Sequence, residues 1–305
     1  MCGFAGFVGE VENREQVLEN MIDTIIHRGP DSSGKFVDED AALGFRRLSI
    51  IDLSESGDQP LYNEDRSKVL VFNGEIYNYQ ELREELIQAG HTFVSNTDSE
   101  TLIHGYEQWG EELVYRLRGM YAFAIWDQKA KRLFSARDIF GIKPLYYAQM
   151  NGTLMFGSEI KSFLEHPKFD KVFNEDALGN YLSFQFVPTN ETFFKGVFCV
   201  QPGHYFVYEN GKMTIKRYFE PNFTGDTTKS FEEVVDDIEK VMKESVEMHK
   251  ISDVEVASYL SSGVDSSYLT YLGQVDRTFT VGFDEGKYKR DSGCERVCSK
   301  HQHEK

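Results

Sequence analysis

Four short apolar segments follow one another in the middle of the chain, with only brief polar turns between them. The first two flank the turn Asp127–Lys131, and the last two flank Asn151-Gly152, a dipeptide typical of two-residue β-hairpin turns. Two hairpins in such close succession leave no room for the crossover helices that parallel strands need, so a simple parallel array is excluded here. The expected strands are residues 120–126, 133–136, 146–150 and 153–156.

Helices and further strands precede these hairpins. Apolar residues recur at helical spacing between residues 17 and 26. Residues 78–81 have the form of a capping box that opens a helix ending near Gly90. This mixture of strands and interleaved helices predicts an α+β domain. Two more strands are expected at residues 44–52 and 69–72, and the second runs into Asn73-Gly74-Glu75.

The composition changes near residue 188. Residues 188–229 hold three of the seven prolines, which predicts a crossing segment between two domains. The chain then has the order helix, strand, small-residue loop, helix and strand, which is typical of a doubly wound parallel sheet. The expected elements are an amphipathic helix at 231–242, strands at 254–260 and 278–283 around the loop 261–267, and a helix at 290–300.

Length and charge limit the function classes. A chain of 305 residues predicts two domains. The net charge of −17 argues against nucleic acid, whose binding proteins are basic, and against anionic membrane surfaces. No run approaches the roughly 18 apolar residues of a membrane span. Four cysteines in a chain of this length indicate reduced thiols and a cytoplasmic protein.

Residues 2–6 read Cys-Gly-Phe-Ala-Gly directly behind Met1. If Met1 is removed, Cys2 carries a thiol and a free α-amine on one residue, and the amine has a pKa near ~8, so it can serve as the base for the thiol. Glycines beside it let backbone pass close to a small substrate. The plainer interpretation is a small apolar residue. The sequence therefore makes Cys2 a candidate nucleophile.

The loop Ser261-Ser262-Gly263-Val264-Asp265-Ser266-Ser267 lies between an expected strand and an expected helix. Backbone N–H groups at a helix start bind anions, and Asp265 is a candidate Mg²⁺ ligand beside a phosphate. The lysine of a Walker loop is absent. A Ser/Gly linker is the alternative, but the position between strand and helix favours an anion site.

Cys294, Cys298, His301 and His303 form a second cluster with ligand chemistry. The cysteines are spaced to lie on one helix face and to chelate zinc, although the spacing matches no standard zinc motif. Two half-buried thiols beside a polar loop are the favoured interpretation.

These motifs together resemble glutamine-hydrolysing asparagine synthetases. The first part is similar to a class II glutamine amidotransferase, and residues 261–267 are similar to the pyrophosphate loop of ATP pyrophosphatases. The resemblance covers the whole chain. It is carried by the Cys2 start, residues 27–31 (HRGPD), 47–52 (RLSIID), 73–75 (NGE), 97–100 (TDSE), 137–147 (RDIFGIKPLYY), 156–161 (FGSEIK) and 261–267 (SSGVDSS).

The resemblance implies the fold and the domains. An α+β N-terminal-nucleophile hydrolase, built as a four-layer αββα sandwich, would span residues 2–190. A crossing segment would occupy 191–229. Residues 230–305 would form an incomplete α/β parallel-sheet domain of the adenine-nucleotide hydrolase type. Because only two strands of that sheet precede Lys305, we expect the second domain to be truncated and the chain to retain only the glutaminase half of the reaction.

The resemblance also implies roles for individual residues. Cys2 would attack the side-chain amide of glutamine, Arg47 would bind the α-carboxylate with its planar fork, and Asp98 would bind the α-ammonium. The amide of Asn73 and the N–H of Gly74 would form the oxyanion hole. The implied glutamine-binding set is Arg47, Ile51, Asn73, Gly74, Glu75 and Asp98. The implied ATP-binding set is Ser261, Ser262, Gly263, Val264, Asp265, Ser266 and Ser267.

Plainer structural roles compete with three of these. Arg47 could form a surface salt bridge, Asp98 could be an ordinary helix N-cap, and Asn73-Gly74 could be a hairpin turn. In the second loop, Ser262 stands where the family has glycine, so its side chain must point away from a phosphate.

The implied reaction consumes glutamine, aspartate and ATP with Mg²⁺, and gives asparagine, glutamate, AMP and pyrophosphate through a β-aspartyl-adenylate. No prosthetic group is implied, and a homodimer is compatible with the resemblance. One alternative is an enzyme that amidates another carboxylate in antibiotic or polysaccharide synthesis. A second is a non-catalytic remnant, against which the presence of Cys2, Arg47, Asn73 and Asp98 argues.

Overall fold

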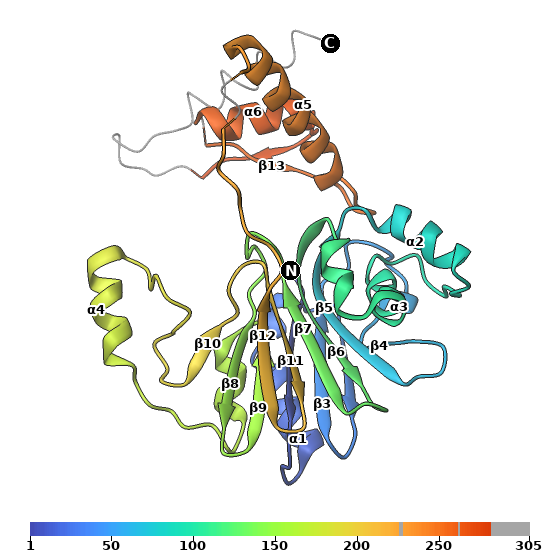
Figure 1. Ribbon diagram of the computed structural model, residues 1–305, viewed down its shortest axis with the longest axis vertical. Helices are drawn as coiled ribbons and strands as arrows, with labels where there is room; N and C mark the ends of the chain where they lie inside the picture. Colours follow the sequence, from blue (N-terminus) through green and yellow to red (C-terminus); the bar gives the residue numbers. More distant parts are fainter. Residues whose placement is uncertain (226–227, 262, 282–305) are drawn as a thin grey trace. The chain divides into compact units, whose positions relative to one another are not determined.

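The computed structural model describes residues 1–225, 228–261 and 263–281. These residues divide into two compact units, Met1–Asn222 and Phe223–Lys305, and each is described by itself. In Figure 1 the first unit contains two sheets and the second contains a helix-rich end of the chain.

The N-terminal strand lies in the interior of sheet A, which has the strand order β10-β8-β9-β1-β3-β2. β1 pairs antiparallel with β3 on one side and with β9 on the other. All six residues of β1 are buried, so the chain start is fixed within the core. The strands are β1 (Gly3–Val8), β2 (Ser32–Val37), β3 (Ala41–Arg47), β8 (Tyr146–Met150), β9 (Thr153–Gly157) and β10 (Val197–Cys199).

Sheet B is also antiparallel and has the order β12-β11-β7-β6-β5-β4. Its longest pairing joins β5 to β6 in one continuous register, from Lys68 opposite Asp127 to Ile76 opposite Gly119. The strands are β4 (Leu61–Tyr62), β5 (Lys68–Ile76), β6 (Gly119–Asp127), β7 (Arg132–Arg137), β11 (His204–Glu209) and β12 (Lys212–Arg217).

Three buried apolar clusters separate four layers. The central cluster joins the facing sides of the two sheets through residues such as Phe4 and Trp126. The outer face of sheet A packs on α1 through Phe7 and Leu18, and the outer face of sheet B packs on α2 and α3 through Phe123. The predicted αββα sandwich is therefore confirmed. The covering helices are α1 (Arg14–Asp23), α2 (Tyr79–Gln88) and α3 (Ser99–Trp109).

Both predicted hairpins form. β6 pairs with β7 and β8 pairs with β9. The turn between β8 and β9 places Asn151 at φ 49° and Gly152 at φ 75°, the left-handed conformation that this dipeptide tolerates best. The short-range turn chemistry was therefore sufficient to locate these strands.

Two local predictions are wrong. A strand is expected over residues 44–52, but β3 ends at Arg47. The next backbone N–H groups bond to side chains instead of to a neighbouring strand: the Leu48 N–H donates to the Cys2 sulfur, and the Ser49 N–H donates to the Asp31 carboxylate. The capping box at residues 78–81 does not form. The Asn78 side chain bonds to the backbone at residues 116 and 118 and leaves the first turn of α2 uncapped.

The domain boundary also differs from the expected one. The predicted crossing segment 191–229 contains β10, which completes sheet A, and β11 and β12, which extend sheet B. These strands belong to the sandwich because β10 pairs with β8 and β11 pairs with β7. The first unit therefore extends to Asn222. It also includes α4 (Glu175–Phe184).

The second unit begins with α5 (Phe231–His249), whose start is a complete capping box between Ser230 and Glu233. A strand–helix–strand succession follows, and its two strands pair in parallel as predicted. The strands are shorter than expected, and the expected helix 290–300 lies outside the described residues. The elements are β13 (Ser258–Tyr259), α6 (Val264–Gly273) and β14 (Thr278–Phe279).

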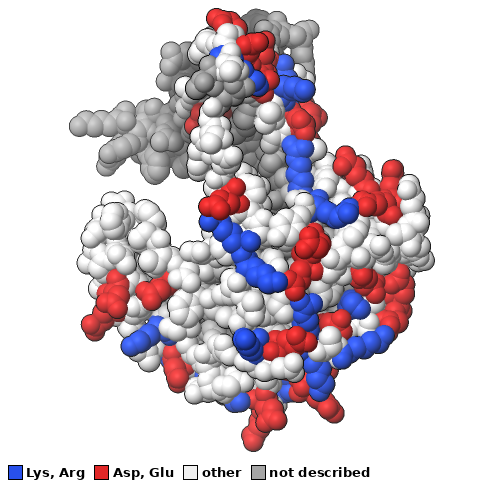
Figure 2. Space-filling model, viewed as in Figure 1, with Lys and Arg blue, Asp and Glu red and all other residues white. Residues whose placement is uncertain are grey.

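Acidic and basic side chains are interspersed on the face of the first unit seen in Figure 2, and no continuous basic stripe crosses that face. This distribution agrees with the acidic balance of the sequence. Among the described helices, none combines the length and apolar character that crossing a bilayer demands.

Candidate active site

One pocket of the first unit is lined by every residue predicted for glutamine chemistry. The two residues before β1, the end of β3 and part of β5 line it, together with the segment before α3. The pocket is a small open cavity of about 60 Å³. Residues that are up to 96 positions apart in the sequence thus meet at one end of the two sheets. The predicted residues that line it are Cys2, Arg47, Ile51, Asn73, Gly74, Glu75 and Asp98.

Cys2 precedes β1 and is half-buried in the pocket wall. Its thiol donates a hydrogen bond to the Leu48 carbonyl oxygen at 3.4 Å, and its sulfur accepts one from the Leu48 N–H at 3.3 Å. Burial raises the pKa of the Cys2 thiol. At neutral pH the group is therefore a thiol, which must give its proton to a base before it can act as a nucleophile.

Asn73 and Gly74 lie within β5, so the alternative of a hairpin turn is wrong. Asn73 is 1% exposed. In the amide orientation that satisfies both neighbours, Asn73 Nδ2 donates to the Cys2 carbonyl oxygen at 3.1 Å, and its Oδ1 accepts from Arg28 at 3.3 Å. A Cβ at Gly74 would lie 2.2 Å from the Met120 carbonyl oxygen on β6. The close approach of β6 therefore requires glycine at this position.

Arg47 is the last residue of β3 and is 6% exposed. It forms the ion pair that the plainer alternative expects, with Asp58, but its guanidinium is buried rather than on the surface. One terminal nitrogen donates to the Ser54 carbonyl oxygen at 2.7 Å and to Asp58 Oδ1 at 2.9 Å. The other donates to the carbonyl oxygens of Ile51 and Asp52. The guanidinium thus orders the loop that carries Ile51. A substrate carboxylate could bind it by taking the place of Asp58, because both are planar carboxylates.

Asp98 is the N-cap residue of α3, and its carbonyl oxygen accepts hydrogen bonds from the Thr101 N–H at 3.1 Å and the Thr101 hydroxyl at 2.6 Å. Its side chain makes no capping hydrogen bond, so the carboxylate remains available for another partner. Its Oδ2 instead accepts a hydrogen bond from the Ile76 N–H at 2.8 Å. Burial, assisted by the neighbouring Glu75 carboxylate, raises the pKa of Asp98 to about 7. A cation placed beside Asp98 would stabilise its ionised form, so this carboxyl is suited to an ammonium ligand.

Two cationic side chains of the site were not predicted. Arg28 donates from Nε to the Cys2 carbonyl oxygen at 2.9 Å and from Nη1 to Glu159 at 3.1 Å. Lys143 lines the pocket, and burial lowers its pKa although the nearby charge of Glu75 opposes this shift. Both residues lie in segments that carried the family resemblance, but only the fold places them beside Cys2.

The loop that carries Lys143 is held by the side chains of Arg137 and Asp138. Asp138 is fully buried, and its carboxylate accepts from the backbone N–H groups of Lys143 at 3.0 Å and Ile142 at 2.9 Å. Arg137 donates to the Lys143 carbonyl oxygen at 2.8 Å. The Arg137-Asp138 pair therefore fixes the position of the lysine.

The predicted anion loop of the second unit leads directly into α6, with Gly263 at the N-cap. Ser266 Oγ accepts from the Ser261 N–H at 3.1 Å and lies 2.9 Å from Ser261 Oγ, so the loop is closed on itself. Asp265 is exposed in the first turn of α6. Val264 and Ser267 belong to the same turn, and Ser262 lies outside the described residues, as do Cys294, Cys298, His301 and His303.

Comparison with protein families gives two matches. Residues 1–219 match the model of a glutamine amidotransferase domain, and residues 237–304 match the model of asparagine synthase. The first match ends within three residues of the first structural unit, which ends at Asn222.

Among curated relatives, asparagine synthetase [glutamine-hydrolyzing] 1 of Bacillus subtilis is 43% identical over 295 residues, which cover 93% of this chain and 46% of the relative. Amidase chyE of Penicillium rubens is 36% identical over 330 residues, covering 97% of this chain and 48% of the relative. The chain spans about half the length of the curated relatives it matches.

Among solved structures, glutamine phosphoribosylpyrophosphate amidotransferase from B. subtilis superposes with a TM-score of 0.55 at 17% identity, covering 94% of this chain and 68% of that one. This likeness concerns the fold alone, and it agrees with the α+β sandwich described above.

Proposed function

Because this chain belongs to the glutamine amidotransferase family, we propose that its first unit hydrolyses glutamine to glutamate and ammonia with Cys2 as the nucleophile. One observation carries the proposal: Cys2, Arg47, Asn73 and Asp98, which are separated in the sequence, line the same pocket. The route requires cleavage of the bond between Met1 and Cys2, which frees the α-amine of Cys2.

In the proposed reaction the Cys2 α-amine accepts the thiol proton, and the sulfur attacks the side-chain carbonyl carbon of glutamine. The oxyanion that forms is stabilised by the Asn73 amide and the Gly74 N–H. When this intermediate collapses, the C–N bond breaks, the ammonium of Cys2 protonates the leaving nitrogen, and ammonia departs. Water then hydrolyses the thioester to release glutamate and restore the thiol.

Arg47 and Asp98 bind the two ends of the amino-acid backbone in this proposal. The guanidinium faces the α-carboxylate in place of Asp58, and the Asp98 carboxylate faces the α-ammonium. Arg28 and Asn73 act on the Cys2 carbonyl group and thereby position the nucleophile. Glu75 and Ile51 complete the wall of the pocket.

The test measures ammonia and glutamate release from glutamine by the purified chain, after mass spectrometry has shown whether Met1 is removed. Cys2→Ala should abolish release and leave the far-ultraviolet circular dichroism unchanged. Cys199→Ser is the matched control, since Cys199 is the other described cysteine and lies outside the pocket. Wild-type activity in the Cys2→Ala variant would exclude this mechanism.

For the second unit we propose transfer of the ammonia to a carboxylate that ATP has activated, with aspartate as the acceptor. The asparagine synthase match over residues 237–304 and the 43% identity to a B. subtilis asparagine synthetase support this proposal. The backbone N–H groups at the start of α6 would face the pyrophosphate. The exposed carboxylate of Asp265 fits Mg²⁺, which prefers oxygen ligands and is commonly shared with phosphates.

The free thiols of Cys2 and Cys199 fit a reducing compartment, and we propose the cytoplasm as the location of the protein.

A different acceptor is the competing proposal, because two relatives named as amidases match 97% of this chain at 36% and 33% identity. The deciding assay supplies ATP, Mg²⁺, ammonia and one carboxylic acid at a time, and measures pyrophosphate. Release that depends on aspartate supports asparagine formation, and release that depends on another acid supports the competitor. A protein that releases neither ammonia nor pyrophosphate would be the non-catalytic remnant.

A further inference from the structure

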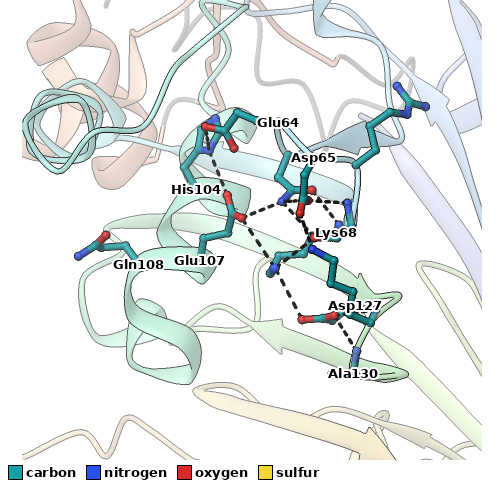
Figure 3. Close-up of polar contacts among 12 residues, drawn as sticks. Glu64, Asp65, Lys68, His104, Glu107, Gln108, Asp127 and Ala130 are labelled. Atoms are coloured by element: carbon teal, nitrogen blue, oxygen red, sulfur yellow. Dashed lines mark hydrogen bonds and ion pairs between the residues drawn. The ribbon is translucent and has the colours of Figure 1, made fainter.

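Two histidines and two glutamates converge beside α3, and none of the four lines the Cys2 pocket. His104 and Glu107 lie one helical turn apart on α3, Glu64 lies in the turn between β4 and β5, and His91 follows α2. One nitrogen or oxygen atom of each residue lies within 4.8 Å of those of the other three. In Figure 3 the side chains of Glu64, His104 and Glu107 point toward one another.

The centre of this cluster contains buried polar atoms without hydrogen-bond partners. His104 is 1% exposed, and neither of its ring nitrogens makes a hydrogen bond, nor does Oε2 of Glu107. His104 Nδ1 lies 3.5 Å from Glu107 Oε2 and 3.7 Å from Glu64 Oε1. Buried groups of this kind are normally paired, because an unpaired one costs about 1–3 kcal/mol. The atoms therefore face a common partner.

The spacing fits a metal ion better than direct hydrogen bonds. His91 Nδ1 lies 3.9 Å from Glu107 Oε2, so the three measured separations range from 3.5 to 3.9 Å. A tetrahedron with edges of about 3.5 Å has its centre about 2.1 Å from each corner, which is the length of a Zn–N or Zn–O bond. The other separations are at most 4.8 Å, so the side chains would have to rotate to bring all four atoms to that distance.

The side chains of the same residues are already held in place. Glu107 Oε1, the outer oxygen of that carboxylate, accepts from Asn63 Nδ2 at 2.7 Å. Glu64 Oε1, which is itself the inward-facing oxygen, is oriented by the Thr92 N–H at 3.2 Å. His91 Nε2 lies 3.2 Å from Gln108 Oε1, to which it donates when Nδ1 is the ligand. Hydrogen bonds of this kind orient ligands and fix the histidine tautomer in metal sites.

We propose that Glu64, His91, His104 and Glu107 bind a divalent transition-metal ion, with zinc as the best match. Four protein ligands would make the site closed, as structural zinc sites are. The ion would join α3, the segment after α2 and the β4–β5 turn, so it would stabilise the helical layer of sheet B. It takes no part in glutamine chemistry.

The competing arrangement has no metal and a protonated His104 among carboxylates. Burial alone would lower the pKa of His104, but the carboxylates of Glu100 and Glu107 outweigh it and raise the pKa to about 9. Such an imidazolium would donate hydrogen bonds to the neighbouring carboxylates. The His104 nitrogens instead lie 3.5 to 3.7 Å from the carboxylates of Glu64, Glu100 and Glu107 and make no hydrogen bond to them.

The experiment measures binding of Zn²⁺ and Co²⁺ to the chelator-treated full chain by equilibrium dialysis and metal analysis. We expect one ion per chain, a Co²⁺ absorption spectrum of tetrahedral type, and a higher melting temperature with zinc. His91→Ala, at a half-buried position, and Glu64→Gln, at an exposed one, should lower the affinity at least about 100-fold. The exposed Gln108→Ala should lower it about tenfold through loss of the His91 contact.

Two controls separate this cluster from the other candidate ligands of the chain. Cys294→Ser/Cys298→Ser removes the second cluster noted in the sequence, and His249→Ala removes an exposed histidine of the second unit. Both should keep the wild-type affinity. A wild-type chain that binds no Zn²⁺ at micromolar concentration would overturn the proposal. So would binding that survives in Gln108→Ala and His91→Ala and is lost in the cysteine variant.

Discussion

Replacing Asp98 by Asn should change how stability depends on pH. The unfolded pKa of an aspartate is about 3.9, whereas the pKa of Asp98 in the folded chain is about 7. Between these values the folded state binds one more proton than the unfolded state, so the free energy of unfolding falls by about 1.4 kcal/mol per pH unit. The contribution is complete below pH ~4 and is lost as pH rises through ~7, a total of roughly 4 kcal/mol.

Asn cannot ionise, and its amide oxygen can still accept the hydrogen bond from the Ile76 N–H. Urea unfolding of the glutamine-free protein at pH 5, 6, 7 and 8 measures the effect. From pH 5 to pH 8 the wild type should lose roughly 3 kcal/mol relative to Asp98→Asn. Glu84→Gln, which changes an exposed carboxylate on α2, should follow the wild type. Parallel pH profiles for the wild type and Asp98→Asn would refute the reasoning that burial holds Asp98 protonated.

Four further predictions concern the pocket and the backbone around it. In the Cys2→Ala protein at pH 6, glutamine binding should release protons, because the α-ammonium of glutamine favours the ionised form of Asp98. Calorimetry in two buffers of different ionisation enthalpy should detect this release. The Cys2→Ala/Asp98→Asn protein should show no such release. Arg47→Lys should raise KM about tenfold or more, because one ammonium cannot replace a planar fork, whereas Asn73→Ala should lower kcat by about 10²–10³. Steady-state kinetics check both, and an unchanged kcat in Asn73→Ala would remove its oxyanion role. Gly29→Ala should destabilise the fold by about 3 kcal/mol or more, since the new Cβ would lie 2.3 Å from the Arg46 carbonyl oxygen. Gly179→Ala on α4 places its Cβ in open space and should stabilise the fold slightly. Urea unfolding measures both changes.

Local chemistry was enough to predict the elements whose cause is local. The Asn151-Gly152 turn requires only two residues in left-handed conformations, and both adopt them. The failed capping box at Asn78 has a distant cause, because its side chain is used by backbone groups near residue 117. The end of β3 at Arg47 likewise depends on Cys2 and Asp31, which only the folded chain brings near.

The predicted pocket residues could be found because each stands in a short distinctive motif. Arg28 and Lys143 could not be assigned roles, since each acts through a contact with a segment distant in sequence. His91 and His104 gave no signal for a related reason. Their spacing matches no metal motif, and their convergence with Glu64 depends on the packing of α3 against the β4–β5 turn.

The place of β1 within sheet A has a consequence during synthesis on the ribosome. Ala5 pairs with Gly157, which is made 152 residues later. At about 5–20 residues per second, the N-terminal strand waits roughly 8–30 s for its second neighbour. During that interval an aminopeptidase can reach the bond between Met1 and Cys2 while one edge of β1 is still without its partner strand. In the folded unit β1 is wholly buried, whereas Met1 lines the pocket and is 52% exposed. A chain that folds with Met1 still attached keeps the Cys2 amine in a peptide bond, and an aminopeptidase must then reach that bond at the pocket.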